Sequence, residues 1–266
     1  MKGSLHYQRV SEMPGLVLSD AQLSDFQFGR HYHLDYHIGI VTQGFHKQTS
    51  RGGSTVLGPG SIAVMPPGEM HDGRGLDNGT YTLKTFRIPA QLLRSCIDTV
   101  QESFSGGLPG ATTIEDSALA QRLMQLHRQL PGLDALAAQE QWLATLEPLL
   151  SRLDVGTPLA VHKGLATRDW KRVRDYCHAH IADKISLDQL AKLCDLGKFQ
   201  FLRRFERATG ITPHAWLIRL RLEQACVLLS SGKSALVDVA NSVGFYDQSH
   251  FNRTFRLAYG VTPSNY

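Results

Sequence analysis

Two groups of polar side chains in this 266-residue chain have the types and spacing to do chemistry. Near the C-terminus, the segment VGFYDQSHFNRTF, from Val243 to Phe255, mixes hydrogen-bonding side chains with apolar ones. Near the N-terminus, RHYHLDYH places histidines at even separations, and another histidine ends the segment PPGEMH. Polar side chains on one face of a helix suit the recognition of base edges, whereas clustered imidazoles suit a metal ion or a polar ligand.

The C-terminal segment is predicted to be a short turn followed by a helix. Gly244 suits the turn, and Asp247 has the side chain of a helix N-cap. Phe251 and Phe255 lie four residues apart, so both face a core. The outward face then carries Gln248, Ser249, His250, Asn252, Arg253 and Arg256. Because Arg can bond both acceptors of guanine and Gln or Asn can pair with adenine, this face fits the DNA major groove.

The same helix, turn and helix pattern occurs twice, at about 187–208 and 236–258. In the first copy, Ser186 and Gln189 predict a capping box, and Gly197 is expected to break the chain between the helices. A solvated helix face would explain one polar face. Two copies favour a duplicated helix-turn-helix module that reads DNA.

Charge is distributed unevenly along the chain. Residues 162–266 hold 16 Lys and Arg against 9 Asp and Glu, a net charge of +7. Residues 1–161 hold 12 against 15, a net charge of −3. A basic half that contains both helix-turn-helix copies favours an anionic partner such as DNA.

The second copy resembles the signature of the AraC/XylS family of bacterial transcription regulators. The matching residues are D-VA-SVGF-DQS-F-R-F---GVTPS. The resemblance implies double-stranded DNA as the partner, with one recognition helix from each copy in two adjacent major grooves. The joining helix, expected from Pro213 to about Ser231, would span about 27 Å, near the spacing of one DNA turn.

The resemblance also nominates DNA-contacting residues in each copy. Those of the first copy are Lys198, Phe199, Gln200, Arg203 and Arg204, and those of the second are Gln248, Ser249, His250, Asn252 and Arg253. Base contacts specify a sequence whereas phosphate contacts position the protein, so we expect Arg203 and Arg253 to read bases. The segment LGKFQF departs from the family, which often has Ser just after the first turn.

Residues 1–90 are predicted to form short β-strands, because apolar runs such as HIGIVTQ and TYTLKTF are separated by Gly, Pro and Asn clusters. RHYHLDYHIGIVTQG and GSIAVMPPGEMHDG resemble the cupin-like barrel that precedes many AraC-family DNA-binding domains. The resemblance implies a small-molecule effector, and a divalent metal in those cupins that bind one. The nominated residues are His31, His33, His37 and His71 for either ligand, with Tyr81 for the effector.

Three interpretations of the histidines remain open. In one continuous strand, His31, His33 and His37 would share a face, where they could hold zinc, nickel or iron(II). They could instead contact an effector without a metal. The opposite face, at 32–40, is apolar and could be the core, which would leave the histidines solvated or hydrogen-bonded. Arg87 ends a later strand, where it could meet an anionic ligand, although an exposed strand end is the commoner case.

Residues 116–153 have helical periodicity and are predicted to form a helical hairpin around Pro131 and Gly132. Leucines recur on one side of each helix, at Leu119, Leu123, Leu126 and Leu130, then at Leu136, Leu143, Leu146 and Leu150. Packing against the barrel explains these leucines. The resemblance also implies that helices 116–153 form a homodimer interface.

Four cysteines, Cys96, Cys177, Cys194 and Cys226, lie far apart with no CxxC pair. We therefore predict small buried residues rather than a zinc knuckle or a disulfide framework. The start of the chain lacks the apolar core of a signal peptide, and no apolar run approaches the roughly 18 residues that cross a bilayer. A cytoplasmic protein with no membrane partner is expected.

These patterns together predict an α+β protein of two domains. Residues 1–155 are expected to form a cupin-like β-barrel with a flanking helical hairpin, 156–168 a linker, and 169–266 an all-α double helix-turn-helix. The predicted function is transcription regulation by sequence-specific DNA binding under the control of an effector, without catalysis, with RNA polymerase as a further partner. The alternative is a metal-dependent cupin enzyme with an appended DNA-binding domain.

Overall fold

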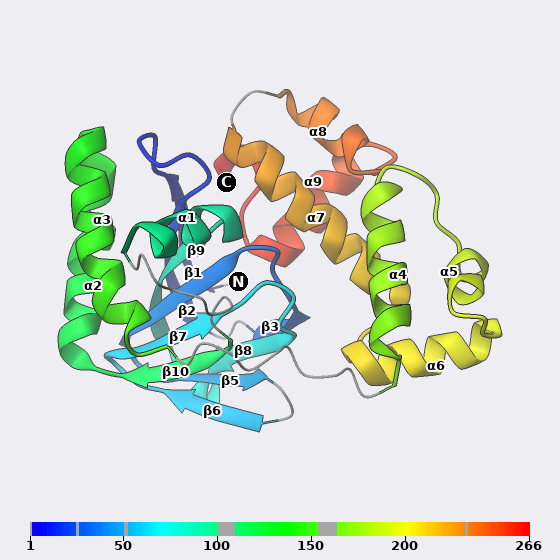
Figure 1. Ribbon diagram of the computed structural model, residues 1–266, viewed down its shortest axis with the longest axis horizontal. Helices are drawn as coiled ribbons and strands as arrows, with labels where there is room; N and C mark the ends of the chain where they lie inside the picture. The colour runs from blue at the N-terminus through cyan, green and yellow to red at the C-terminus, as the bar shows by residue number, and fades with distance from the viewer. Residues whose placement is uncertain (1, 25–26, 51–52, 101–109, 154–163, 232–233) are drawn as a thin grey trace. The chain divides into compact units, whose positions relative to one another are not determined.

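The computed structural model describes residues 2–24, 27–50, 53–100, 110–153, 164–231 and 234–266 (Figure 1). The chain divides into two compact units, one of residues 1–158 with the last two residues, and one of residues 159–264. Of the expected linker at 156–168, residues 156–163 lie outside the described residues. A helix begins at Thr167, before the expected end of the linker. Each unit has its own buried aromatic and aliphatic side chains.

The first unit contains two antiparallel β-sheets. In spatial order, the larger sheet consists of β1 (Lys2–Arg9), β2 (Val17–Ser24), β9 (Tyr81–Ile88), β4 (Tyr36–Gln43), β7 (Ser61–Met65) and β10 (Thr112–Glu115). The smaller sheet consists of β3 (Gln27–His31), β8 (His71–Gly75), β5 (His46–Ser50) and β6 (Gly53–Leu57). Among the strands that the structure describes, no ladder joins the two sheets, so the expected barrel is a cupin-like sandwich that is not closed.

Helices cover one face of the larger sheet. They are α1 (Ala90–Val100), α2 (Ser117–Gln129) and α3 (Ala135–Leu150), and short 3-10 turns lie at η1 (Leu76–Asn78) and η2 (Leu130–Gly132). Asp116 and Asp134 cap α2 and α3 by accepting hydrogen bonds from backbone N–H groups. The expected helical hairpin is confirmed, and most of its leucines pack into the core beneath it. Leu136 is the exception, since it is 68% exposed.

Strand β4 is buried on both faces. Ile38 and Ile40 belong to the core between the larger sheet and the helices. Val41 faces the other way and packs with Leu57 and Ala63, which lie on opposite sheets. The apolar face of the histidine segment is therefore core, and the interior of the sandwich lies on the other side of β4.

Strand β10 lies outside the stretch at 1–90 in which the sequence predicts β-strands. Its residues, TTIE, pair with β7, and only Ile114 among them is buried. A strand with one buried residue has no apolar alternation to detect, which is why the sequence pattern did not reveal it.

The second unit is helical throughout the residues that are described. Its helices are α4 (Thr167–Ala179), α5 (Leu187–Leu193), α6 (Lys198–Thr209), α7 (Pro213–Ser231), α8 (Leu236–Ser242) and α9 (Gln248–Tyr259), followed by the 3-10 turn η3 (Pro263–Asn265). Helices α5 and α6 form the first helix-turn-helix, α8 and α9 form the second, and α7 joins them (Figure 1). The expected all-α double helix-turn-helix is confirmed.

Aromatic side chains hold each recognition helix to its neighbours. In the first copy, Phe205 packs against Trp170 of α4 and Trp216 of α7, with ring centroids 5.6 and 5.9 Å away. In the second copy, the fully buried Phe251 of α9 packs against Phe245 of the turn before it, with ring centroids 5.2 Å apart. Such pairs add to the free energy of folding beyond the burial of their area, and they fix which face of each helix points outward.

The two copies turn at the same position but with different residues. In the second, Gly244 has φ +85°, and a Cβ there would lie 2.6 Å from the carbonyl oxygen of Ile181, so no side chain fits. In the first, the left-handed residue is Asp195, with φ 54°, whereas Gly197 has φ −69° and serves as the N-cap of α6. Asp195 and Gly244 stand at the same position of the two copies, four residues after Ala191 and Ala240, and the extra turn residue of the second copy follows that position.

A buried carboxylate joins α7 to α9. Glu223 is fully buried; its Oε1 accepts a hydrogen bond from the Tyr259 hydroxyl at 2.6 Å and lies 3.2 Å from Nη2 of Arg219. The Arg219 guanidinium also lies over the Tyr259 ring, 4.7 Å from its centroid. A buried charge is tolerated only when it is paired and hydrogen-bonded, so these contacts hold the second recognition helix against the joining helix.

We predict that Tyr259→Phe lowers the free energy of unfolding by about 1–3 kcal/mol, because the buried Glu223 carboxylate loses a donor. Urea denaturation followed by far-UV circular dichroism measures the change. The matched control is Tyr176→Phe, whose hydroxyl accepts only a long, exposed bond of 3.4 Å from Gln189 and should cost less than about 0.5 kcal/mol. Equal losses in the two variants would contradict the role of the Glu223 contact.

Candidate functional site

Helix α6 presents the polar face that the sequence predicts for the first recognition helix. The side chains of Lys198, Phe199, Gln200, Arg203 and Arg204 are all exposed. Phe199 is 82% exposed. Phe201 and Phe205 are fully buried on the opposite side of α6. The exposed residues begin in the first turn of the helix.

Helix α9 presents a similar face with one difference. Ser249, His250 and Arg253 are exposed, and Gln248 is half-buried. Asn252 is also half-buried, and its Oδ1 is buried with no hydrogen-bond partner among the described residues. The Asn252 amide therefore lies partly inside the unit, where the sequence pattern expected it to point outward. The N-terminal end of α9 is fixed by Asp247, which accepts from the backbone N–H of His250 at 2.7 Å.

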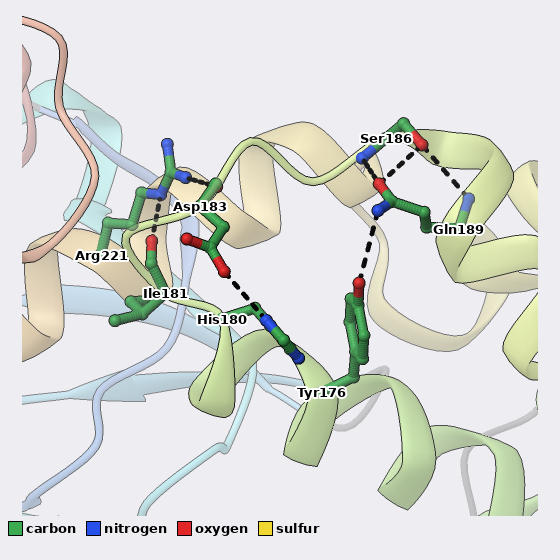
Figure 2. Close-up of polar contacts among 7 residues, drawn as sticks. All are labelled: Tyr176, His180, Ile181, Asp183, Ser186, Gln189 and Arg221. Atoms are coloured by element: carbon green, nitrogen blue, oxygen red, sulfur yellow. Dashed lines mark hydrogen bonds and ion pairs between the residues drawn. The ribbon is translucent and has the colours of Figure 1, made fainter.

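Joining helix α7 also holds the segment between α4 and the first helix-turn-helix, as Figure 2 shows. Arg221 donates from Nε to the carbonyl oxygen of Ile181 at 3.0 Å and from Nη2 to that of Asp183 at 2.7 Å. His180 donates from Nδ1 to the Asp183 carboxylate at 2.9 Å. Partial burial lowers the pKa of Arg221 from its ordinary value, but a guanidinium stays charged under all ordinary conditions.

The start of α5 carries the expected capping box (Figure 2). The Gln189 side-chain oxygen accepts from the backbone N–H of Ser186 at 2.7 Å, and the Ser186 hydroxyl oxygen accepts from the backbone N–H of Gln189 at 3.3 Å. Gln189 also donates to the Tyr176 hydroxyl of α4. These bonds position α5, which supports the recognition helix α6.

Histidines gather in the first unit, beside the interior of the sandwich. The side chains of His31, His33 and His71 each place a ring nitrogen within 4.8 Å of the others. His37 stacks on His33, with ring centroids 3.6 Å apart and ring planes 15° apart. The structure thus brings together all four histidines that the sequence nominated, but His37 is outside the set whose nitrogen atoms converge.

The sequence pattern suggested that His31, His33 and His37 lie on one continuous strand. In the structure they do not. Strand β3 ends at His31 and β4 begins at Tyr36, so His33 lies in a bend between them. The Cα atoms of His31 and His71 are partners in the β3–β8 ladder, after a register shift. Convergence therefore comes from a bend and a cross-strand pair, which alternation along a single strand cannot reveal.

A second polar group lies between the two sheets. His46 of β5 stacks on Tyr81 of β9, with ring centroids 4.8 Å apart. Both ring nitrogens of His46 and the Tyr81 hydroxyl are buried with no hydrogen-bond partner among the described residues. Gly73 makes room for the imidazole, because a Cβ there would lie 2.3 Å from Nε2 of His46. The sequence analysis nominated Tyr81 but not His46, which stands in no motif.

Burial controls the ionisation of this pair. Desolvation is the main cause that lowers the pKa of His46 to about 4, with the nearby His71 adding to the effect and Asp72 opposing it. Desolvation also raises the pKa of the Tyr81 hydroxyl above its usual value. Near neutral pH, both groups are therefore uncharged hydrogen-bonding groups in an apolar interior.

Arg87 is buried, not exposed at a strand end as the sequence pattern suggested. It is 4% exposed, and its Nε donates to the Asp35 carboxylate at 2.7 Å. The carboxylate lies in the bend between β3 and β4, so this ion pair fixes the bend that carries His33. The alternation of β9 places Arg87 on the same face as Tyr81, inside the sandwich.

The cysteines are all buried and free, as predicted. Burial raises the pKa of the Cys177 thiol to about 12 and that of Cys194 to about 11, so neither is a reactive thiolate near neutral pH. Within the described residues, no helix is both long enough and apolar enough to span a bilayer.

Family models match both units. Residues 13–147, just over half of the chain, match an AraC-like ligand binding domain, and residues 190–266 match a helix-turn-helix domain. The transcriptional activator RhaS of an Enterobacter species is 26% identical over 257 residues, covering 93% of this chain and 90% of its own. The uncharacterised regulator YbfI of Bacillus subtilis is 26% identical over 227 residues, covering 84% and 81%.

Solved structures share the fold. An apo variant of ToxT from Vibrio cholerae superposes with a TM-score of 0.62 at 11% identity, covering 94% of this chain and 95% of its own. Wild-type ToxT bound to an unsaturated fatty acid gives 0.58 at 11% identity, covering 98% and 92%. With a ligand-binding domain followed by a helix-turn-helix domain that binds DNA, the chain belongs to the AraC family of transcription regulators.

Proposed function

We propose that α6 and α9 are the recognition helices of this regulator and enter two successive major grooves. The observation that carries this proposal is the pair of exposed polar faces, each beginning at the first turn of a helix whose other face is fully buried. The nineteen residues of α7 span about 28 Å, close to one turn of DNA. Lys198, which lies 3.5 Å from Asp188, and Arg204 are assigned to phosphates or the groove edge.

Arg203 and Arg253 are assigned to bases, because a guanidinium can donate to both O6 and N7 of guanine. Both side chains are exposed and each follows the N-terminal turn of its helix. Asn252 contributes less than the sequence pattern suggests, since its amide oxygen is buried. Gln248, Ser249 and His250 would provide the remaining contacts of the second helix.

We predict that Arg253→Ala weakens binding to the selected DNA site by about 1–3 kcal/mol and relaxes the preference at one base pair. Arg256→Ala is the matched control: it removes the same charge from the exposed last turn of α9. Any loss of binding that Arg256→Ala causes should be the same for all DNA sequences. Titration of the preferred site and of single-base variants at fixed salt measures both effects. A uniform loss for Arg253→Ala would reassign that residue to phosphate.

The effector is proposed to bind between the two sheets of the first unit, where it would supply hydrogen bonds to His46 and Tyr81. Buried polar groups without partners each cost about 1–3 kcal/mol, and a ligand with donor and acceptor groups would remove that cost. His31, His33, His37 and His71 are proposed to lie at the same site. ToxT binds an unsaturated fatty acid, but the neutral polar groups here favour an effector with hydrogen-bonding substituents. Its binding would favour one arrangement of the two units over another.

Tyr81→Phe tests this site without knowledge of the natural effector. Removal of a hydroxyl that has no partner among the described residues should leave the melting temperature unchanged or raise it. The same variant should lose the thermal shift that any small molecule from a polar metabolite library produces in the wild type. A strongly destabilised variant would show that the hydroxyl is structural. Unchanged ligand shifts would place the effector elsewhere.

Three further aspects of function are proposals. A homodimer through helices 116–153 would use their outward side, where Leu136 is exposed, because most of the other leucines are in the core. RNA polymerase is a further partner in a regulator that activates transcription. We also propose that the protein acts on chromosomal DNA in the cytoplasm and has no catalytic activity, in line with relatives that are named as regulators.

A further inference from the structure

We propose that His31, His33 and His71 bind one divalent transition-metal ion, of which zinc is the representative. Each offers a ring nitrogen, and these atoms all lie within 4.8 Å of one another. His33 and His71 are buried and His31 is half-buried, so the ion would be largely shielded from water. The site stands apart from the DNA contacts proposed above and does not depend on them.

Backbone contacts bring these histidines together. His31 and His71 are cross-strand partners, and their ring centroids are 4.3 Å apart. The carbonyl oxygen of His33 accepts from the backbone N–H of Gly68 at 2.8 Å, which ties the bend to the loop before β8. The ion pair between Arg87 and Asp35 fixes the same bend. A site formed in advance by the fold loses little conformational entropy when the ion binds.

Hydrogen bonds also select the tautomer that a metal needs. Nδ1 of His71 lies 2.9 Å from the carbonyl oxygen of Glu69, and Nδ1 of His31 lies 2.7 Å from that of Gly29. A carbonyl oxygen can only accept, so Nδ1 carries the proton in both neutral rings and Nε2 carries the lone pair. Histidines that bind metals commonly have this arrangement, in which a backbone carbonyl orients the ring and raises its basicity.

The donor set determines the class of ion. Three imidazoles with no carboxylate suit zinc, nickel, cobalt or copper, whereas magnesium and calcium require oxygen ligands. With metal–nitrogen bonds of about 2.0–2.1 Å, the three nitrogens would have to approach to ~3.3 Å, a small movement of side chains. Three protein ligands leave a coordination position for water or for a donor atom of another molecule.

Two nearby groups are assigned other roles. His37 stacks on His33 and lies outside the converging set, so the site has three protein ligands, not the four that the sequence nominated. Asp35 is paired with Arg87 and is not a member of the set either. His37 therefore provides a matched control, because it is an adjacent histidine that the proposal excludes.

The test uses the full-length protein after treatment with a chelator. Competition with a chromophoric chelator measures zinc affinity and stoichiometry, with magnesium as the negative control. Cobalt(II) absorption in the visible range reports the ligands directly. The proposal predicts one zinc per chain, an affinity at least about 100-fold weaker in His31→Gln and in His71→Gln, and an affinity within about threefold of the wild type in His37→Gln.

Circular dichroism shows whether each variant is folded, and His31→Gln is the safer substitution because His31 is half-buried at a strand end. Wild-type protein that binds neither zinc nor cobalt more tightly than it binds magnesium would overturn the proposal. Equal binding by the folded His31→Gln variant and the wild type would do the same. A loss in His37→Gln as large as that in His31→Gln would overturn the assignment of three ligands. DNA binding, measured on the same samples, reports the proposed recognition helices separately.

Discussion

The positions of both recognition helices depend on the side chains of the joining helix α7. Helix α7 carries Trp216, which packs against the core of the first copy, and Arg221, which bonds two carbonyl groups ahead of α5. Glu223, two residues later, accepts from Tyr259 at the end of α9. One helix thus contributes polar contacts to both copies. Rigid helices of this kind position side chains for base recognition more accurately than loops do.

The buried polar groups Glu223, in the second unit, and His46 and Tyr81, in the first, differ in their hydrogen-bond partners. In the second unit, the buried charge of Glu223 has Arg219 and Tyr259 as partners, and it holds the structure together. In the first unit, His46 and Tyr81 are buried without partners among the described residues. Unsatisfied polar groups weaken a fold, and they are retained where a ligand or another function requires them. The pair His46 and Tyr81 therefore supports the proposal that the interior of the first unit binds a ligand.

Much of the second unit could be predicted from sequence because its signals are local. The capping box at Ser186, the N-cap at Asp247 and the spacing of Phe251 and Phe255 each follow from residues within one helical turn. Asn252 was placed less well, since helical periodicity gives the direction of a side chain only approximately. Its amide oxygen is buried although its neighbours Ser249 and Arg253 are exposed.

The first unit was harder to predict because its site depends on contacts between distant segments. The alternation at 32–40 correctly marked an apolar face as core, but it could not show that β3 ends at His31. Nor could it show that Asp35 pairs with Arg87, more than fifty positions along the chain. His46 stood in no motif, and its importance comes only from Tyr81 and Gly73 beside it. The bend, the bulge and the packing of two sheets are tertiary properties.

The proposed function requires that both helix-turn-helix copies read DNA. The most direct test is to select fragments of sheared genomic DNA from the source organism with the purified full-length protein, at one fixed salt concentration because phosphate contacts depend steeply on salt. If both copies read DNA, the selected fragments will share a two-part motif whose halves are about 10 base pairs apart, one for each recognition helix. A motif with a single half, or no enrichment in the presence of a ligand that stabilises the first unit, would contradict it.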